Sequence, residues 1–185
     1  DPMISLEEEM SSGTLITFEE DQKMEAAVVS GIAFSRDEAK FTLRAVPDTP
    51  GVAYSILGPI AAANIEVDIG LPNLSVQGTT DFSFTVSRND ALRTKELLMN
   101  QVGPAVGAGE IVFDEAVCKV SIVGIGMRNH AGIASSMFRA LSEEGINIQM
   151  ISTSEIKTSC LIEAEHADRA VVVLHDGFEL EKPAG

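Results

Sequence analysis

The sequence contains no tryptophan and only one tyrosine, so any hydrophobic core must be mostly aliphatic, with phenylalanine filling the larger gaps. Hydrophobic residues make up 45% of its 185 residues, which is enough for one large core or two small ones. No apolar run approaches the length of a membrane span. The first residues, DPMISLEEEM, lack the basic and apolar regions of a secretory signal and do not resemble a natural start. We therefore expect a cut or cloned fragment without a secretory signal.

Basic side chains are also scarce. The chain has 13 Lys and Arg against 28 Asp and Glu, which gives a formal net charge of −15. Nucleic-acid affinity comes mainly from Lys and Arg that neutralise phosphates, and anionic membrane surfaces attract the same residues. We therefore expect neither a nucleic-acid partner nor a membrane partner. The net negative charge favours solubility but does not indicate which ligand the protein binds.

Cysteine and histidine are too few, and too far apart, to predict a metal site. Cys118 and Cys160 lie in alternating apolar runs, which favours buried, reduced thiols over a disulfide framework or a zinc site. His130, His166 and His175 have no ligand spacing with one another or with cysteine, and the last two are predicted on solvated helix faces. We expect no metal and a reducing, cytoplasmic compartment.

What the sequence does contain is an internal repeat. The segments Val46–Ser83 and Met127–Ile162 share one pattern of strand, polar corner, glycine, helix and second strand, and Gly51 and Gly132 lie 81 residues apart. The same offset relates Ala53 to Ala134, Ile65 to Ile146 and Val67 to Ile148. A constant offset predicts two copies of one small domain.

Apolar periodicity gives each copy the strand and helix order β-α-β-β-α-β, which is ferredoxin-like. The second copy lacks its last strand, because nothing strand-like follows Phe178, while Ala26–Phe34 is a strand without a helix of its own. We therefore predict that this early strand completes the second sheet and that the first unit is inserted inside the second. Strands are predicted at Thr14–Phe18, Ala26–Phe34, Phe41–Val46, Ile65–Leu71, Thr80–Val86, Glu110–Phe113, Cys118–Val123, Ile146–Thr153 and Thr158–Glu163.

The helices are predicted from their apolar stripes and their starting residues. Asp48 precedes Pro50 and Asp90 precedes a helix to about Val102, so both aspartates are predicted as helix caps. Pro59 lies inside the first helix and should kink or loosen it. The later helices carry their stripes on Ile133, Met137 and Leu141, and on Ala167, Ala170, Val171, Leu174 and Phe178.

No catalytic constellation is recognisable. Gly124-x-Gly126 lies between a strand and a helix, as in a dinucleotide loop, but the third glycine of that fingerprint would fall at Asn129 and no parallel βαβ unit surrounds it. These glycines are better explained as a tight turn. Serine, histidine and aspartate are present without a nucleophile context, so we expect no catalysis by this chain alone.

The two corners before the repeated helices are the better candidates for a binding site. Asp48–Ala53 and Asn129–Ala134 each combine a polar residue with free backbone N–H groups at a helix N-terminus, which suits a carboxylate. A free amino acid offers that carboxylate and an ammonium for a nearby aspartate or a strand carbonyl. The alternative is that Asp48 and Asn129 merely cap helices, and composition and spacing alone favour it.

Three segments resemble the regulatory part of aspartate kinase, which consists of two ACT domains. They are VPDTPGVAYSILGPIAAANIEVD, GTTDFSFTV and KVSIVGIGMRNHAGIASSMFRALSEEGINIQMISTSEIK. The likeness runs from about Gly13 to Leu180, and GTLITFEED resembles the end of the catalytic domain. The fold class implied is α+β, two ferredoxin-like ACT domains with the first inserted in the second. The implied boundaries are 1–25 for a linker or the end of the catalytic domain, 26–36 for the strand completing the second ACT domain, 37–115 for the first and 116–181 for the second.

The resemblance also implies a function. ACT domains of this family bind threonine and lysine and thereby lower the rate of aspartate phosphorylation. Two regulatory chains pair so that the first ACT domain of one meets the second of the other, with effector at the junction. Partners would be threonine, with or without lysine, a second copy of the chain, and the catalytic domain or subunit. ATP and Mg²⁺ would belong to that catalytic part, and this chain would hold no cofactor. Effector-binding residues carried over are Asp48, Gly51, Val52, Ala53, Asp68, Pro72, Asn73, Asn129, His130, Gly132, Ile133, Ala134, Asn147, Ile148, Ser154 and Glu155.

One departure from the family pattern bears on that site. Pro72 stands where family members have a glutamine that contacts effector, and proline offers neither a side-chain amide nor a backbone donor. Gly70 adds backbone freedom in the same strand. The rival interpretation is therefore a module that dimerises the kinase and has weakened or lost effector binding.

Overall fold

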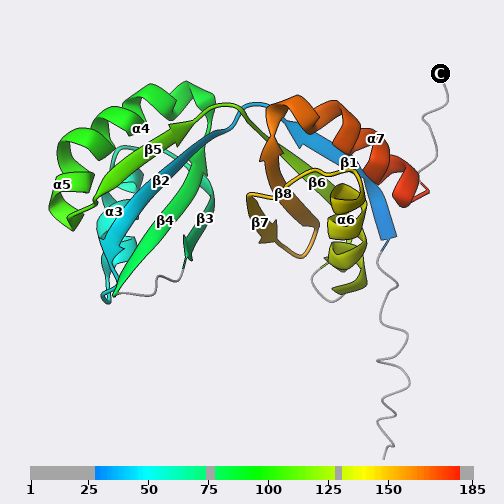
Figure 1. The fold of residues 1–185 in the computed structure, drawn as a ribbon, viewed down its shortest axis with the longest axis horizontal. Coiled ribbons are helices and arrows are strands. Elements are labelled where there is room, and N and C mark those ends of the chain that lie inside the picture. Colours follow the sequence, from blue (N-terminus) through cyan, green and yellow to red (C-terminus); the bar gives the residue numbers. More distant parts are fainter. Residues whose placement is uncertain (1–27, 74–77, 128–130, 180–185) are drawn as a thin grey trace, which may run out of the picture.

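The computed structural model describes residues 28–73, 78–127 and 131–179, which form two α+β domains side by side (Figure 1). The predicted strand at Thr14–Phe18 lies outside the described residues. Each domain has one four-stranded antiparallel sheet, and helices cover the outer face of each sheet. None of the described helices is both long enough and apolar enough to cross a membrane.

The first domain has the strand order β3-β4-β2-β5. The edge position of β3 suits its Pro72, because proline has no backbone N–H and would leave a gap in the hydrogen bonds of a central strand. A bulge between Leu43 and Val46 interrupts the β2–β4 pairing, and the Asp81 carboxylate accepts a hydrogen bond from the Ala45 amide there, at 2.9 Å. The strands are β2 (Ala39–Pro47), β3 (Val67–Asn73), β4 (Thr79–Val86) and β5 (Glu110–Asp114).

The helices of the first domain follow its apolar stripes. Ile56 and Ile60 of α3 are fully buried against Phe41 and Phe84 of the sheet, which fill the space that tryptophan would otherwise take. The helix assignment runs unbroken through Pro59. The helical segments are α3 (Val52–Ala62), a 3₁₀ turn η1 (Arg88–Asp90), α4 (Ala91–Leu97), a π-helical segment η2 (Leu98–Val102) and α5 (Gly103–Val106).

The second domain has the strand order β1-β6-β8-β7. Met137 and Leu141 of α6 and Leu174 of α7 are fully buried against the central strands. The elements are β1 (Val28–Ser35), β6 (Val117–Ile125), α6 (Ala131–Glu143), β7 (Met150–Thr153), β8 (Lys157–Glu163), a 3₁₀ turn η4 (Ala164–His166) and α7 (Ala167–Gly177).

The predicted donation of the early strand is confirmed. β1 pairs antiparallel with β6, from Val28 opposite Ile125 to Ser35 opposite Lys119. Ile32 of β1 packs against the core of the second domain. The whole first domain is therefore an insertion between two neighbouring strands of the second sheet.

Neither predicted aspartate caps a helix with its side chain, although Asp90 does stand directly before α4. Gly51 is the residue before α3, and no side chain caps that helix. The second helical region begins one turn earlier than predicted, because Ser87 caps η1 by accepting from the Asn89 amide at 3.2 Å. Asp90 instead offers its main-chain carbonyl to the Thr94 hydroxyl, at 2.8 Å.

The strand predicted at Ile146–Thr153 is shorter than expected. Only Met150–Thr153 is a strand, and just before it the Gln149 amide donates to the Leu161 carbonyl at 2.8 Å. Ile146 is instead part of the buried core of the domain, and Ile148 packs against that core. Apolar alternation alone does not distinguish such a packed extended segment from a paired strand.

Both cysteines are fully buried in the second domain, as predicted, so their thiols report on that domain alone. Burial raises the pKa of the Cys118 thiol, and it raises the pKa of Cys160 to about 12. Because the thiolate is the reactive form, both side chains should be inert toward thiol reagents while the second domain is closed.

Deleting residues 1–35 should therefore open the second domain more than the first. Without β1, the apolar groove between β6 and α7 is exposed and β6 becomes an unprotected edge. We expect Cys118 and Cys160 to react with a thiol reagent at neutral pH in the deleted chain and not in the full chain. Amide exchange at Phe41 and Leu43 in β2 is the control and should stay slow. Equal loss of protection in both domains would contradict the insertion.

Candidate functional site

The first corner is the turn from β2 into α3. Gly51 there has a φ of 90°, a conformation that favours glycine. The Val52 amide donates to the Thr49 carbonyl at 3.2 Å, and the first helical bond runs from Ser55 to the Gly51 carbonyl at 2.9 Å. Ala53 is the second residue of α3, so its amide precedes that first helical bond. The helix N-terminus therefore presents amide donors without a side-chain cap.

A cavity of about 370 Å³ lies at this corner. It extends from the corner to α5, where Ala105 and Val106 line it, and Tyr54 at its rim is 81% exposed. Asp48 is exposed next to it, and its amide donates to the Gly78 carbonyl at 3.0 Å. That bond ties the end of the β3–β4 connection to the corner. The cavity is lined by Pro47, Thr49, Pro50, Gly51, Val52, Tyr54, Ser55, Ala105 and Val106.

The second corner is the turn from β6 into α6. Gly126 adopts a φ of 72°, which explains the glycine here as a turn residue rather than part of a dinucleotide loop. The β7–β8 turn is bonded to this corner, since the amide of Met127 donates to the Glu155 carbonyl at 3.1 Å and that of Gly124 to the Ile156 carbonyl at 2.8 Å. Ser154 closes the turn by accepting the Lys157 amide at 3.2 Å. The structure thus brings Ser154 and Glu155 to the second corner.

The remaining predicted residues divide between these corners and the strands behind them. In the second domain, Gly132 is exposed near the start of α6 and Ile133 packs on the core. Asn147 is exposed and Ile148 half-buried in the segment before β7. Among the described residues, no hydrogen bond or ion pair joins the first corner to Asn147 or Ile148. Val52 and Ala134 are half-buried, Ala53 is exposed, Pro72 and Asn73 end β3, and Asn129 and His130 lie outside the described residues.

Asp68 of β3, one of the predicted effector residues, has a charged partner from the other domain. The Lys119 ammonium of β6 lies between the carboxylates of Asp68 and Glu38, with a distance of 2.8 Å to Glu38 Oε1. Burial raises the pKa of Glu38, and the facing Lys119 only partly opposes that effect. Burial alone would lower the pKa of Lys119, but its bonds to Asp68 and Glu38 raise it, so the lysine is charged. No motif or spacing in the sequence predicts this contact.

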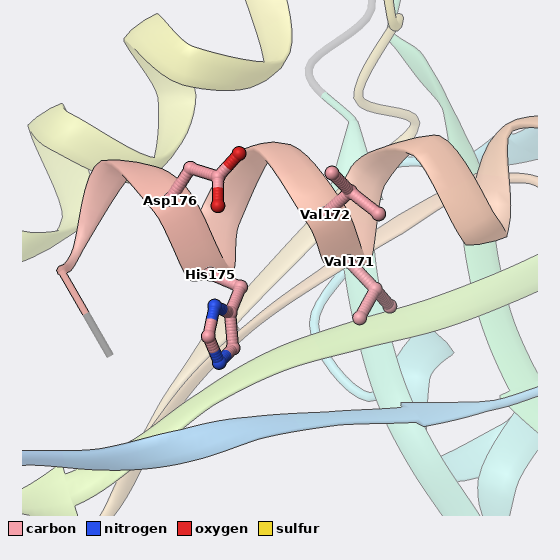
Figure 2. A pocket seen from close by; sticks show the side chains of 4 residues that line it. All are labelled: Val171, Val172, His175 and Asp176. Atoms are coloured by element: carbon pink, nitrogen blue, oxygen red, sulfur yellow. The ribbon is translucent and has the colours of Figure 1, made fainter. Parts of the chain in front are cut away.

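Two other features lie away from the corners. A cavity of about 370 Å³ runs along α7, where Val171, Val172, His175 and Asp176 line it (Figure 2). None of the predicted effector residues lies on this helix. His166, half-buried like His175 rather than solvated, has its Nε2 atom 3.5 Å from a Glu165 carboxylate oxygen. With Glu163 this is a surface cluster of one imidazole and two carboxylates, and we assign it no ligand.

The comparisons with known proteins agree with this architecture. A family model of the ACT domain matches residues 120–178. The solved structure of aspartokinase alpha and beta subunits contains a chain that is 55% identical, with a TM-score of 0.77, and the likeness covers 83% of this chain and all of that one. The chain belongs to the regulatory part of the aspartokinase family.

Other relatives support the same assignment. The ligand-free regulatory subunit of aspartate kinase from Thermus thermophilus is 33% identical with a TM-score of 0.77, over 81% of this chain and 99% of that one. The aspartate kinase of Pseudomonas fluorescens strain SBW25 is 58% identical over 172 residues, which is 93% of this chain and 41% of the relative. The chain thus spans about two fifths of the length of the curated relatives it matches.

The two equivalent glycines of the aspartokinase repeat allow a matched test of the corner geometry. Gly51→Ala should lower the free energy of unfolding by about 1–2 kcal/mol, because an L-residue is strained at positive φ. Gly132→Ala should be neutral or stabilising by about 0.4–1 kcal/mol, since Gly132 is helical and open space surrounds the new methyl group. Urea unfolding of both variants measures the difference. Equal effects would show that the first corner is not held in the left-handed conformation.

Proposed function

We propose that this regulatory module binds threonine, with or without lysine, and transmits feedback inhibition to aspartate phosphorylation. The first corner carries the proposal. It combines uncapped amides at the N-terminus of α3, a cavity of about 370 Å³ and the exposed carboxylate of Asp48. Amides at a helix N-terminus attract a carboxylate, and an aspartate attracts an ammonium, so the corner suits one end or the other of a zwitterionic amino acid.

A complete site needs a second corner to face the first. In our proposal Asp48 takes the ammonium, while amides at the facing corner of another chain hold the carboxylate. The segment of Asn147 and Ile148 would approach from that chain, since no hydrogen bond or ion pair joins these two residues to the first corner within the described part of one chain. The effector then lies between the first domain of one copy and the second domain of its partner.

Such an arrangement requires a homodimer. β1 and β5 are the outer edge strands of the two sheets, whereas β3 and β7 contact each other within the chain, and Phe34 of β1 is 51% exposed. Edge strands with apolar side chains are available for pairing across chains. Sedimentation velocity at concentrations well above micromolar, with threonine present, should give a dimer. A monomer under those conditions would remove the composite site.

The proposed partner of the module is the catalytic part of aspartate kinase, which supplies the phosphotransfer. ATP and Mg²⁺ would be held by that part, and we assign no residue of this chain to them. The role of the module is then to convert occupancy of the effector site into a change of catalytic rate.

The rival function, dimerisation without tight effector binding, rests on Pro72. This residue lies in β3 opposite Phe82 of β4, and it contributes no amide at a position where the family pattern has one. Calorimetric titration of the dimer with threonine and lysine decides between the two functions. A dinucleotide titrated in parallel tests the glycine pair of the second corner.

Asp48→Ala should weaken threonine binding by about ten- to a hundred-fold, because a charged hydrogen bond contributes roughly 1.5–3 kcal/mol. The measurement is calorimetry on wild type and variant at matched dimer concentration. Asp176→Ala, which removes an exposed carboxylate from α7, is the matched control and should bind as wild type does. Unchanged affinity in a folded Asp48→Ala variant would show that the carried-over site is wrong.

A further inference from the structure

The internal repeat extends to the contacts between the domains. Lys40 lies opposite Thr85 in the β2–β4 pair, and Lys119 lies opposite Leu161 in the β6–β8 pair. Two residues further along each strand, a hydroxyl pair follows on the same face. Those pairs are Thr42 with Ser83 at 2.9 Å and Ser121 with Ser159 at 2.7 Å. Lys40 and Lys119 therefore occupy the same place in the two copies.

Each of these lysines reaches into the other domain, at a matching place. The Lys40 ammonium donates to the Gln149 side-chain oxygen at 3.0 Å, and the Lys119 ammonium donates to the Asp68 carboxylate. Asp68 and Gln149 are related by the same offset of 81 residues as the corner glycines. Two crossed ties thus join the domains, each from a central strand to the segment that carries predicted effector residues. One tie is ionic and the other ends on a neutral amide.

The ionic tie between Lys119, Glu38 and Asp68 is centred on a nearly fully buried carboxylate. Glu38 is only 4% exposed, and its carboxylate receives both the Lys119 ammonium and the Thr85 hydroxyl. The Lys119 side chain is 16% exposed. A charge pair with so little solvent around it is weakly screened, and loss of one partner leaves the other buried and uncompensated.

The two covalent connections between the domains meet beside this tie. Arg88 of η1 donates through Nε to the Glu38 carbonyl at 3.4 Å and through Nη2 to the Glu115 carbonyl. The Arg88 amide donates to the Asp37 carboxylate at 3.0 Å, and Ser87 donates to the same carboxylate at 2.9 Å. The junction of the domains is therefore a polar network rather than a flexible linker.

We propose that Lys119 is a positioning residue, which through its bridge between Glu38 and Asp68 fixes strand β3 of the first domain against the second domain. β3 carries Asp68, Pro72 and Asn73, so the bridge sets where this part of the effector site stands relative to the rest of the chain. The orientation role concerns one chain by itself. Only its consequence for effector affinity rests on the proposed function.

Paired spin labels test the orientation directly. Leu92→Cys in α4 and Val172→Cys in α7 introduce exposed thiols, one in each domain, where the side chains are 70% and 58% exposed. The native thiols are buried and should not be labelled, which a chain without the added cysteines confirms. Labelled chains are diluted with unlabelled ones, so that only distances within one chain are measured. Wild type should give one narrow distance distribution.

Lys119→Met should shift or broaden that distribution, because the ionic tie is lost. Lys119→Met with Glu38→Gln should regain much of the stability, since no charge is left buried alone, while the distribution stays altered. Asp68→Asn keeps the Lys119–Glu38 pair and serves if the first variant does not fold. Lys40→Met, which removes the neutral tie, is the matched control and should have a smaller effect. An unchanged distribution in both Lys119→Met and Asp68→Asn would overturn the proposal.

The pH dependence of the free energy of unfolding distinguishes the contribution of the Glu38 charge from that of its packing. The pKa of Glu38 lies above its ordinary value of 4.5, so the fold holds the proton more tightly than the unfolded chain does. The stability of wild type relative to Glu38→Gln should therefore fall as the pH rises from 4.5 through the raised pKa. No such difference would mean that Glu38 is not buried beside Lys119. The charged groups that face Glu38 are Asp37, Glu66 and Asp68, with Lys119 and Arg88 opposite in sign.

Threonine affinity gives the last readout. Lys119→Met should weaken threonine binding measured by calorimetry, although Lys119 lies in a different domain from Asp48. Failure of wild type to bind threonine would count against the proposed function and leave the distance measurement intact. Altered distances with unchanged threonine affinity would overturn the positioning of the effector strand.

Discussion

The antiparallel pairing of β1 with β6 is the constraint on which the rest of the structure depends. It completes the second sheet and makes the first domain an insertion between two adjacent strands. Adjacent strands end near each other, so both connections to the first domain leave from the same end of the second sheet (Figure 1). Arg88 can therefore bind the carbonyls of Glu38 and Glu115 together, and Lys119, the partner of Ser35 in that pairing, stands within reach of Glu38.

The two copies share a fold and differ in chemistry. The first corner uses Gly51 in a left-handed conformation, whereas its counterpart Gly132 lies inside α6. The ionic tie to Asp68 is matched by a neutral one to Gln149. These differences allow the two predicted effector segments to respond unequally to salt and pH, even though they share one sequence pattern. A tandem repeat of this kind can keep its architecture while its two sites acquire separate specificities.

Much of the fold follows from the sequence because it depends on local patterns. Buried alternation predicts β2, β4 and β8, and the unmatched strand before residue 36 predicts the insertion. The caps fail because Asp48 and Asp90 compete with Gly51 and Ser87, whose backbone geometry is decided by the turns beside them. The Lys119 bridge could not be predicted, since it joins residues from three distant segments. In the proposed site the carried-over effector residues come from two chains, so a single chain cannot show whether they bind together.

The double connection limits how the domains can move. A domain joined by one chain segment can rotate in any direction, but the first domain is joined by two segments that leave the second domain side by side. Rotation of one domain relative to the other about the line through both segments is then the easiest motion, because a twist about any other axis would stretch one of them. A regulatory signal that passes through this junction is therefore a change along one angle. A small change of that angle becomes a larger displacement at the ends of the sheets, because displacement grows with distance from the hinge line.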